Sequence, residues 1–249
     1  MNERVDHGDA TTWPRDYDAM MRDYYRRRAP AYEETYARPE RQIDLAILRG
    51  HVATRCAGRR VLDVACGTGY WSASIARAAQ SLIGVDANEA ALALAREKKL
   101  HAATGDAQFI EGDAYALDEG LGSFDAAFIG FFWSHVPHDR LARFIGSLHA
   151  RLAPAARVLV LDNDYVEGSS TPIAFVDVEG NAWQERSLSD GTTHRVLKNF
   201  PTRADLIGAL AGHADFTHWW RLDYYWLFEY RLRSEGTVPA CGRQAAHME

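Results

Sequence analysis

The chain has 249 residues, of which 47% are hydrophobic and 25% are charged, and its formal net charge at pH 7 is −6. This length and composition predict a globular protein that buries a substantial core, as one large domain or as one domain with additions. The negative charge argues against a nucleic-acid partner, because proteins that bind such polyanions usually have a basic balance or a dense basic face.

The sequence contains neither a membrane span nor a secretion signal. No apolar run approaches the roughly 20 residues needed to cross a bilayer. Residues 1–16, MNERVDHGDATTWPRD, lack the apolar segment of a secretion signal. The three cysteines, Cys56, Cys66 and Cys241, are unclustered and favour neither a disulfide framework nor a zinc site. We therefore expect a cytoplasmic protein with no membrane partner.

The first predicted elements are helices. Residues 17–55 have helical spacing that is interrupted near Pro30 and Pro39, so two helices are expected. The only basic cluster lies in the first of them, in YYRRRAP, and it comprises Arg26, Arg27 and Arg28. We interpret these arginines as a solvated helix face rather than as a phosphate-binding patch.

Strands and helices then alternate. The stretch VLDVACGTGYWS, residues 61–72, reads as a strand, a tight glycine turn and the start of a helix. Such alternation predicts a parallel sheet with helices on both faces. The further predicted strands cover residues 81–86, 107–113, 123–132 and 156–164, and the helices cover residues 88–99, 138–152 and 202–212.

The pattern changes between Asp164 and Phe200. This segment is rich in turn residues that separate short β-prone pieces, so we expect an inserted hairpin or small cap. Ligands of open α/β sheets bind beyond the carboxyl ends of the strands. An insertion directly after VLVLDND is therefore placed to contribute to a substrate pocket, although a decorative loop is an alternative. Residues 217–222 and 225–232 are expected to form an antiparallel edge.

Acidic residues decide what the glycine turn binds. Gly67, Gly69 and Ser72 nearly satisfy the G-x-G-x-x-G/A pattern of dinucleotide sites, which alone is a weak signal. A pyrophosphate is bound by backbone N–H groups and is not stabilised by the carboxylate of Asp63 directly before the turn. A ligand with an ammonium group would be stabilised by this negative charge. Asp86 ends the next strand, where a carboxylate binds ribose hydroxyls. Together they indicate an adenosine ligand with a cationic amino-acid tail; a capping role is the alternative for Asp63.

Four motifs in this order, VLDVACGTGYWS, GVDANEAAL, IEGDAYAL and FDAAFIGFFWSHV, resemble those of class I S-adenosylmethionine-dependent methyltransferases, over about residues 59–162. The resemblance implies a Rossmann-like, seven-stranded, mostly parallel sheet with S-adenosylmethionine across the strand ends and S-adenosylhomocysteine as product. The residues it implies for the cofactor are Asp63, Ala65, Gly67 and Gly69 for the methionine part, Asp86 for the ribose, Ala87, Asp113 and Ala114 for the adenine, and Gly130 and Phe131 beneath the sulfonium. The turn LAPAARVLV departs from the family, which commonly has a glycine-rich turn there.

The segment DYYRRRAPAYEETY resembles a lid found in many small-molecule methyltransferases of this class, in which a tyrosine reaches the cofactor. The candidates are Tyr24, Tyr25 and Tyr32, with ordinary core packing as the alternative. We accordingly divide the chain into an N-terminal helical lid segment, residues 1–58, and a methyltransferase domain, residues 59–249, whose insertion at 164–200 contributes to the substrate pocket.

The expected reaction transfers a methyl group to an oxygen, nitrogen or sulfur atom of a small molecule, mainly by holding the reactants aligned. His135 is the candidate general base, with packing as its alternative. Trp133, His135 and Asn163 are the candidate substrate-binding residues, and the supply of aromatic residues suits an aromatic or partly apolar acceptor. No metal is expected, because only the DND run at residues 162–164 resembles part of a magnesium site. An NAD(P)-dependent oxidoreductase and a non-catalytic cofactor-binding domain remain as alternatives, and the oligomeric state is open.

Overall fold

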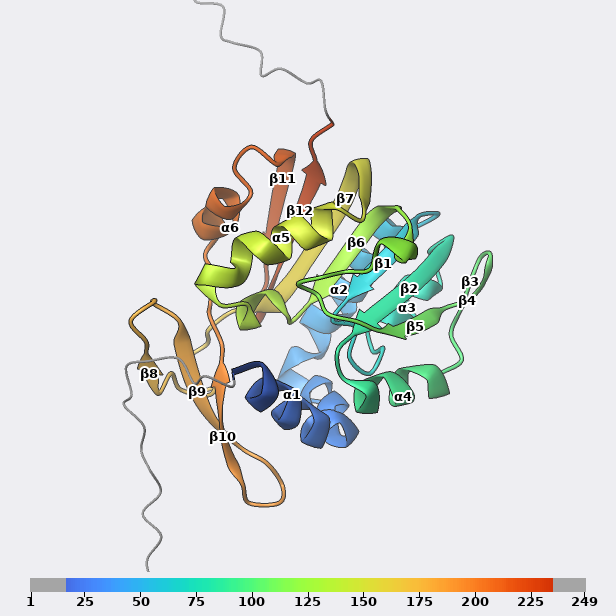
Figure 1. The fold of residues 1–249 in the computed structure, drawn as a ribbon. Coiled ribbons are helices and arrows are strands. Elements are labelled where there is room, and N and C mark those ends of the chain that lie inside the picture. Colours follow the sequence, from blue (N-terminus) through green and yellow to red (C-terminus); the bar gives the residue numbers. More distant parts are fainter. Residues whose placement is uncertain (1–16, 235–249) are drawn as a thin grey trace, which may run out of the picture.

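The computed structural model describes residues 17–234, so the first 16 residues of the predicted lid segment and Cys241 lie outside the described residues. A seven-stranded sheet in the order β11-β12-β7-β6-β1-β2-β5 forms its centre (Figure 1). Only β12 runs antiparallel to its neighbours. The predicted seven-stranded, mostly parallel sheet is therefore confirmed. The strands are β1 (Arg60–Val64), β2 (Ser81–Asp86), β5 (Gln108–Glu111), β6 (Phe124–Gly130), β7 (Leu152–Asn163), β11 (Ala214–Arg221) and β12 (Tyr225–Leu232).

The strand order reverses beside β1, and this reversal positions the site. β1 pairs with β2 on one side and with β6 on the other, so the connections leave toward opposite edges of the sheet. The loops that follow β1 and β6 consequently separate and open a crevice at the carboxyl ends of the strands. The register places Asp63 of β1 between Gly84 and Phe128 in the centre of the sheet.

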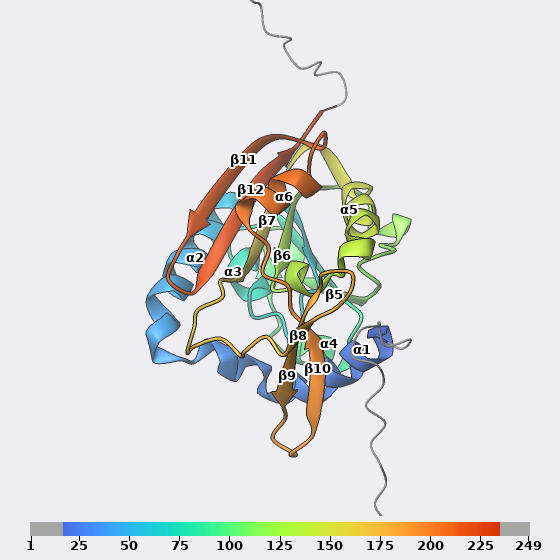
Figure 2. The same cartoon turned by 90° about the vertical axis from the view of Figure 1, so that its left-hand side faces the viewer.

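Helices cover both faces of the sheet, as predicted (Figure 2). Leu45, Leu48 and Val52 of α2 are fully buried against one face, together with Ile75 of α3. Phe144 and the neighbouring apolar residues of α5 are buried on the other face. The helices of the first face are α2 (Gln42–Cys56), α3 (Ser72–Ala76) and α4 (Glu89–Glu97), and those of the second are α5 (Leu141–His149) and α6 (Arg203–Ala209).

The N-terminal segment crosses the carboxyl ends of the strands. The two predicted helices are present as α1 (Tyr17–Arg28) and α2, and the interruption between them is a pair of 3-10 helices, η1 (Ala29–Tyr36) and η2 (Pro39–Arg41). Each 3-10 helix has a proline in its first turn, where the missing N–H leaves no hydrogen bond unmade.

The segment between β7 and α6 forms a separate three-stranded antiparallel sheet, composed of β8 (Phe175–Val176), β9 (Ala182–Ser187) and β10 (Thr193–Leu197). It lies beside α1 (Figure 1). Tyr17, Met21 and Tyr24 of α1 share one buried apolar cluster with Trp183 and Leu197 of this sheet. The N-terminal segment and the inserted sheet therefore pack against each other over the carboxyl ends of the main sheet.

Several local features differ from the expectations. A two-stranded hairpin, β3 (His101–Ala102) with β4 (Gly105–Asp106), precedes β5, and its strands are too short to give a periodic pattern. In the turn LAPA, Ala155 takes a φ of 61°, a left-handed conformation that usually favours glycine. Short 3-10 helices, η3 (Glu119–Leu121), η4 (Trp133–His135) and η5 (His138–Arg140), separate β5, β6 and α5.

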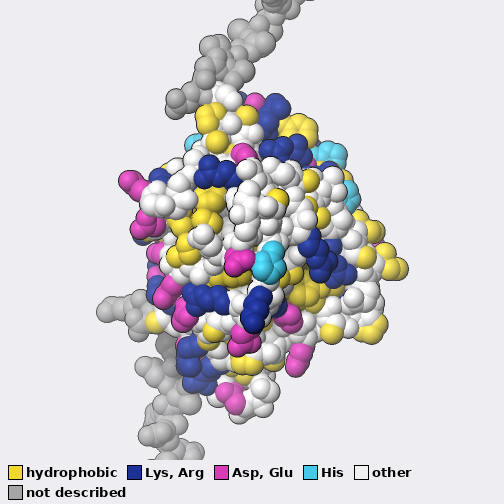
Figure 3. All heavy atoms as spheres, turned by 90° about the vertical axis from the view of Figure 1, so that its right-hand side faces the viewer, with side chains coloured by type: hydrophobic (Ala, Val, Ile, Leu, Met, Phe, Trp, Pro, Cys, Tyr) yellow, Lys and Arg dark blue, Asp and Glu magenta, His cyan; other side chains and the backbone are white. Residues whose placement is uncertain are grey.

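The face at the β5 edge of the sheet shows acidic and basic side chains interspersed (Figure 3). Within residues 17–234, no helix combines the length and the apolar character needed to traverse a membrane.

Candidate cofactor and substrate site

A cavity of about 180 Å³ lies at the carboxyl ends of the strands, below the N-terminal segment. Its walls come from the loops after β1, β2, β5 and β6 and from α1 and η1. The predicted cofactor residues that line it are Tyr25, Tyr32, Ala65, Gly67, Asp86, Ala87, Asp113, Ala114, Gly130 and Phe131. The fold therefore brings most of the predicted residues together around one cavity.

The loop after β1 forms the first wall, and its backbone is tightly wound. Ala65 and Gly69 both have positive φ angles, of 55° and 73°. A Cβ atom at Gly69 would lie 3.1 Å from the Cβ of Ala95 on α4, so this position requires glycine for both conformation and space. Gly69 does not line the cavity; its role in this structure is to let the loop pack onto α4.

Asp86 fixes that loop to the end of β2. Its carboxylate accepts hydrogen bonds of 2.8 Å from the backbone N–H groups of Gly67 and Asn88, one on each oxygen. Burial raises the pKa of Asp86, and the backbone donors oppose that shift. Each carboxylate oxygen can accept a second hydrogen bond, so Asp86 still has capacity for two ligand hydroxyls.

Asp63 lies beneath the loop and is not part of the cavity wall. It is 1% exposed, and the hydroxyl of Ser72 donates a 2.5 Å hydrogen bond to it. Burial, and to a lesser extent the charge of Asp86, raise the pKa of Asp63, while the Ser72 hydrogen bond lowers it; the net result is a pKa of about 7. The structure thus places a poorly compensated carboxylate directly under the glycine turn.

The opposite walls of this cavity are formed mainly by small, apolar residues. Ala87 and Ala114 face the cavity after β2 and β5, beside Asp113, whose carboxylate accepts a 2.9 Å hydrogen bond from the Tyr115 backbone N–H. Gly130, at the end of β6, has no room for a side chain, because a Cβ atom there would lie 2.7 Å from the Phe128 ring. A flat ring system fits between such small residues.

The N-terminal tyrosines divide between two environments. Tyr25 and Tyr32 line the cavity. Tyr24 does not: it is 1% exposed, packs with Met21 in the cluster shared with the inserted sheet, and accepts a 2.7 Å hydrogen bond from Arg28. Tyr24 lies outside this cavity but lines the larger one described below, and its contact with the cofactor stays a prediction.

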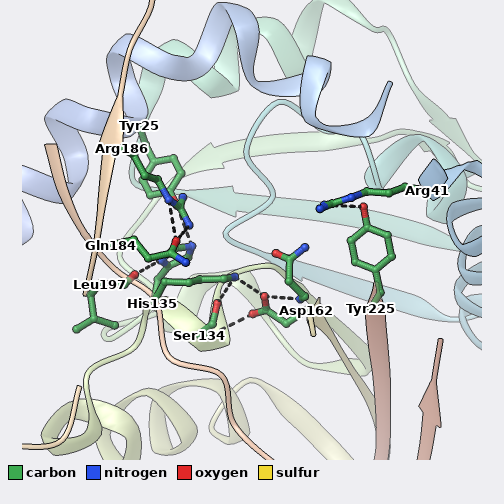
Figure 4. A network of polar contacts seen from close by, with 11 residues as sticks. Tyr25, Arg41, Ser134, His135, Asp162, Gln184, Arg186, Leu197 and Tyr225 are labelled. Carbon is green, nitrogen blue, oxygen red and sulfur yellow. Dashed lines mark hydrogen bonds and ion pairs between the residues drawn. The ribbon is translucent and has the colours of Figure 1, made fainter. Parts of the chain in front are cut away.

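Both ring nitrogens of His135 have partners. Nδ1 lies 2.5 Å from the carbonyl oxygen of Leu197, which can only accept, so Nδ1 carries the proton. Nε2 therefore accepts the 2.8 Å hydrogen bond from the Tyr25 hydroxyl (Figure 4). Burial, with the nearby charges of Lys198 and Arg186, holds the pKa of His135 well below its ordinary value. His135 is a neutral hydrogen-bond acceptor for a tyrosine of the cavity wall.

The remaining predicted substrate residues separate. Trp133 is 4% exposed and packs edge-on against Phe144 of α5, with ring centroids 5.8 Å apart, because η4 turns its side chain into the core. It lines neither cavity. Asn163, at the end of β7, lines the second cavity described next.

A larger cavity of about 620 Å³ adjoins the first. The two share Tyr25, Tyr32, Phe131 and His135 as walls. Its other walls come from α1, η1 and η2, from the loop after β7 and from β9, so residues of the insertion line it, Gln184 and Arg186 among them. The sequence does not predict this larger, polar cavity, and the one related signal is the basic cluster at the end of α1.

The carboxylates of the DND run are both bound to cations. Asp162 is fully buried and accepts hydrogen bonds from the ammonium of Lys198, at 2.5 Å, and from the backbone N–H of Ser134, at 3.1 Å. Asp164 accepts a 2.5 Å hydrogen bond from Arg221. Asp162 therefore holds Lys198 and the η4 turn in place at the base of the larger cavity (Figure 4).

Known proteins are similar to this chain in sequence and in fold. A profile described as a methyltransferase domain matches residues 61–155. The ubiquinone/menaquinone biosynthesis C-methyltransferase UbiE of Methylobacterium nodulans is 32% identical over 176 residues, covering 64% of this chain and 67% of that protein. A demethylmenaquinone methyltransferase of Shouchella clausii is 39% identical over 84 residues, covering 32% of this chain and 36% of that protein. This chain spans only 35–52% of the length of several of the relatives that it matches.

Among solved structures, the DhpI–SAH complex superimposes with a TM-score of 0.71 over 89% of this chain and 99% of that chain, at 24% sequence identity. The shared fold is thus Rossmann-like, with a crevice at the strand reversal. The chain belongs to the class I S-adenosylmethionine-dependent methyltransferase family. This membership confirms the resemblance drawn from the four motifs.

Proposed function

We propose that the protein transfers the methyl group of S-adenosylmethionine to a small molecule. The observation that carries the proposal is the cradle of the smaller cavity, in which Asp86 braces the glycine loop and keeps hydrogen-bonding capacity for a ribose. The names of the relatives, which are methyltransferases of ubiquinone and menaquinone biosynthesis, support a small-molecule acceptor.

The residues of this cavity suit the cofactor. We assign the ribose hydroxyls to Asp86, the adenine to the slot at Ala87, Asp113 and Ala114, and the amino-acid tail to the loop of Ala65 and Gly67. Asp63 and Gly69 act from behind the loop, through charge and through packing respectively. Gly130 and Phe131 form a further wall of this cavity, and Phe131 also lines the larger cavity.

The cofactor supplies a methyl group that its sulfonium already activates. In the transfer, an electron pair of the acceptor would form a bond to the methyl carbon while the carbon–sulfur bonding pair moved to sulfur. The protein's contribution is to hold both reactants in line and to exclude water. We assign that alignment to the shared wall of Tyr25, Tyr32 and Phe131.

Proton transfer by His135 remains a prediction, and its geometry supports a different role. With Nδ1 bound to Leu197 and Nε2 bound to Tyr25, His135 orients the tyrosine at the junction of the cavities. We propose that His135 is a positioning residue. Oxygen, nitrogen and sulfur stay candidate acceptor atoms, and the C-methyltransferase among the relatives adds carbon.

Calorimetric titration with S-adenosylhomocysteine, with NAD and NADP in parallel, tests this proposal. We expect micromolar binding of S-adenosylhomocysteine and none of the dinucleotides. Replacing Asp86 by Ala should weaken binding at least tenfold, since a hydrogen bond to a charged group contributes about 1.5–3 kcal/mol. Binding of NAD or NADP in place of S-adenosylhomocysteine would overturn the proposal.

A screen for transfer of a radiolabelled methyl group to small molecules separates an enzyme from a binding domain. Tight S-adenosylhomocysteine binding without any methyl transfer would support the non-catalytic alternative.

A further inference from the structure

Six cationic side chains line the larger cavity, and the four that are not exposed come from separate parts of the chain. Arg28 ends α1, Arg41 ends η2, Arg186 lies on β9 and Lys198 directly follows β10. In Figure 4, Arg41 and Arg186 are drawn on opposite sides of the space above Asp162. No local sequence pattern unites these residues, so their convergence is a property of the folded chain.

In the part of the chain that the structure describes, only one of these four cations has a carboxylate partner. Lys198 is paired with Asp162. Within residues 17–234, Arg28, Arg41 and Arg186 take part in no ion pair. The cavity therefore carries three guanidinium charges that are at least half-buried and that the described protein does not neutralise by direct contact; Arg38, which also lacks an ion pair there, is exposed.

Neutral groups hold the three guanidiniums in place. Arg28 donates 2.7 Å hydrogen bonds to the hydroxyls of Tyr24 and Thr35. Arg186 donates to the side-chain oxygen of Gln184 through Nε at 3.0 Å and Nη2 at 2.6 Å. Gln184 is itself 2% exposed and oriented by a 2.5 Å hydrogen bond to the Thr171 carbonyl. Such supports fix the direction of a charge without cancelling it.

Arg41 is the most constrained of the three. It is 6% exposed, donates to Ser169 at 3.0 Å and weakly to Tyr225 at 3.5 Å, and its Nε is buried with no hydrogen-bond partner in the described structure. A buried charge without an opposite charge, and with an unused donor, is costly. This cost is offset when a ligand supplies the anion.

The charges of the cavity also act on its other groups. Besides burial, Arg186 and Arg28 lower the pKa of Lys198, against the opposing effect of Asp162. Three acidic side chains line the cavity as well, but all are exposed: Asp190 pairs with Arg27, Glu185 lies 3.7 Å from Arg195, and Glu34 is at the rim. The charged side chains of the cavity wall that are not exposed are all cationic, whereas each acidic side chain of the wall is exposed.

We propose that the methyl acceptor is an anionic small molecule whose oxyanion group, a carboxylate, phosphate or phosphonate, is bound by Arg28, Arg41 and Arg186. The proposal rests on the proposed function, because the cavity is taken as the acceptor site beside the cofactor. A guanidinium binds such groups through two parallel hydrogen bonds. The volume of about 620 Å³ suits a small molecule, and the polar walls contrast with the apolar ring and tail of a quinone.

Three matched probes test the proposal: phenylphosphonate, benzoate and the uncharged benzyl alcohol, titrated calorimetrically into protein saturated with S-adenosylhomocysteine. At least one anion should bind, and benzyl alcohol should bind at least tenfold more weakly. Preference for phenylphosphonate or for benzoate identifies which oxyanion the site takes. Failure of both anions to bind at millimolar concentration, or equal affinity for benzyl alcohol, would overturn the proposal.

Variants assign the binding to the arginines. R186Q and R41Q should each weaken the anion about tenfold, because each removes a charged donor. The control is R231Q, whose side chain is 53% exposed and paired with Asp215 on the far strands, and which should leave anion affinity unchanged. Affinity for S-adenosylhomocysteine, measured on every variant, reports whether the fold and the cofactor site are intact.

The outcomes distinguish the two proposals. If the unaltered protein does not bind S-adenosylhomocysteine, the proposed function is contradicted. Normal S-adenosylhomocysteine binding with unchanged anion affinity in R186Q and R41Q contradicts only the anionic acceptor.

Discussion

Single residues carry the electrostatics of the cofactor site, and Asp63 is the most perturbed of them. Its carboxylate is buried under the glycine loop, where Ser72 donates its hydrogen bond and Asp86 is a nearby like charge. In the protein without ligand, these surroundings favour the protonated form. An ammonium group bound above the loop would favour the ionised form instead.

We therefore expect the affinity for S-adenosylhomocysteine to rise from pH 6 to pH 8. The pKa of Asp63 is raised to about 7, so its ionisation over this range supplies the charge that the ligand's ammonium requires. The same raised pKa means that this group's contribution makes the free protein less stable as the pH rises from about 4 through 7. Calorimetry at several pH values measures the effect.

Asp63→Asn is the matched variant, since it keeps the shape and removes the titration. It should bind S-adenosylhomocysteine more weakly at pH 8 and lose the slope between pH 6 and pH 8. A variant that retains the full slope would assign the titration to Asp86, whose pKa burial also raises.

At the same scale, Tyr25 and His135 should behave as one unit. The Tyr25 hydroxyl donates to Nε2 of His135, and both residues line the cofactor cavity. We expect Tyr25→Phe and His135→Gln each to weaken S-adenosylhomocysteine binding roughly three- to tenfold, the worth of a hydrogen bond. If His135 acts by orienting Tyr25, the double variant should bind no worse than the weaker single variant. Additive losses would contradict this coupling.

At the scale of elements, one buried acid joins α2 to the far strands of the sheet. Glu229 of β12 is 3% exposed and forms ion pairs with Arg55 of α2 and with Arg157 of β7. Because α2 continues directly from η2, this junction also fixes the approach of Arg41 to the larger cavity.

Glu229→Gln should lower the free energy of unfolding by about 3 kcal/mol, since it leaves two arginines without their buried partner. Urea denaturation measures the loss. The exposed pair of Asp215 and Arg231 is the control, and Asp215→Asn should cost less than about 1 kcal/mol. Equal losses in the two variants would mean that Glu229 contributes no more than a surface charge.

The elements also show what could be predicted from the sequence. The strands follow from apolar runs bounded by turn residues, and β12 occupies the predicted residues 225–232. The glycine loop and Asp86 follow from local motifs. Arg41 and Arg186 could not be predicted, because one ends a 3-10 turn, the other lies on a short strand, and neither has a local pattern that indicates a ligand. Residue type alone predicts Trp133 as a wall of the pocket, but the η4 turn directs its side chain into the core.

At the scale of the whole molecule, α1 and η1 form the roof of both cavities, supported from outside by the inserted sheet. The buried apolar residues of α1 pack against the inserted sheet, whereas those of α2 are fully buried against the main sheet. Segments that pack outside the main core unfold locally at a low free-energy cost, and ligands that contact them raise this cost.

Hydrogen exchange should detect that stabilisation. Saturating S-adenosylhomocysteine is expected to slow exchange of backbone amides in residues 17–36, which contact the cofactor cavity, more than in residues 42–56, which are already protected. At 100 times its Kd, the ligand adds about 2.7 kcal/mol to the stability of the parts that must open for exchange. Equal changes in the two segments would contradict a ligand-stabilised roof.

The wall common to the two cavities has a thermodynamic consequence. Both ligands contact the same four side chains, those of Tyr25, Tyr32, Phe131 and His135. The ligand that binds first bears the entropic cost of ordering these side chains, so the second ligand binds with a smaller cost. The coupling is reciprocal: if the cofactor tightens acceptor binding by some factor, the acceptor tightens cofactor binding by the same factor. The product S-adenosylhomocysteine should consequently dissociate faster once the methylated acceptor has left.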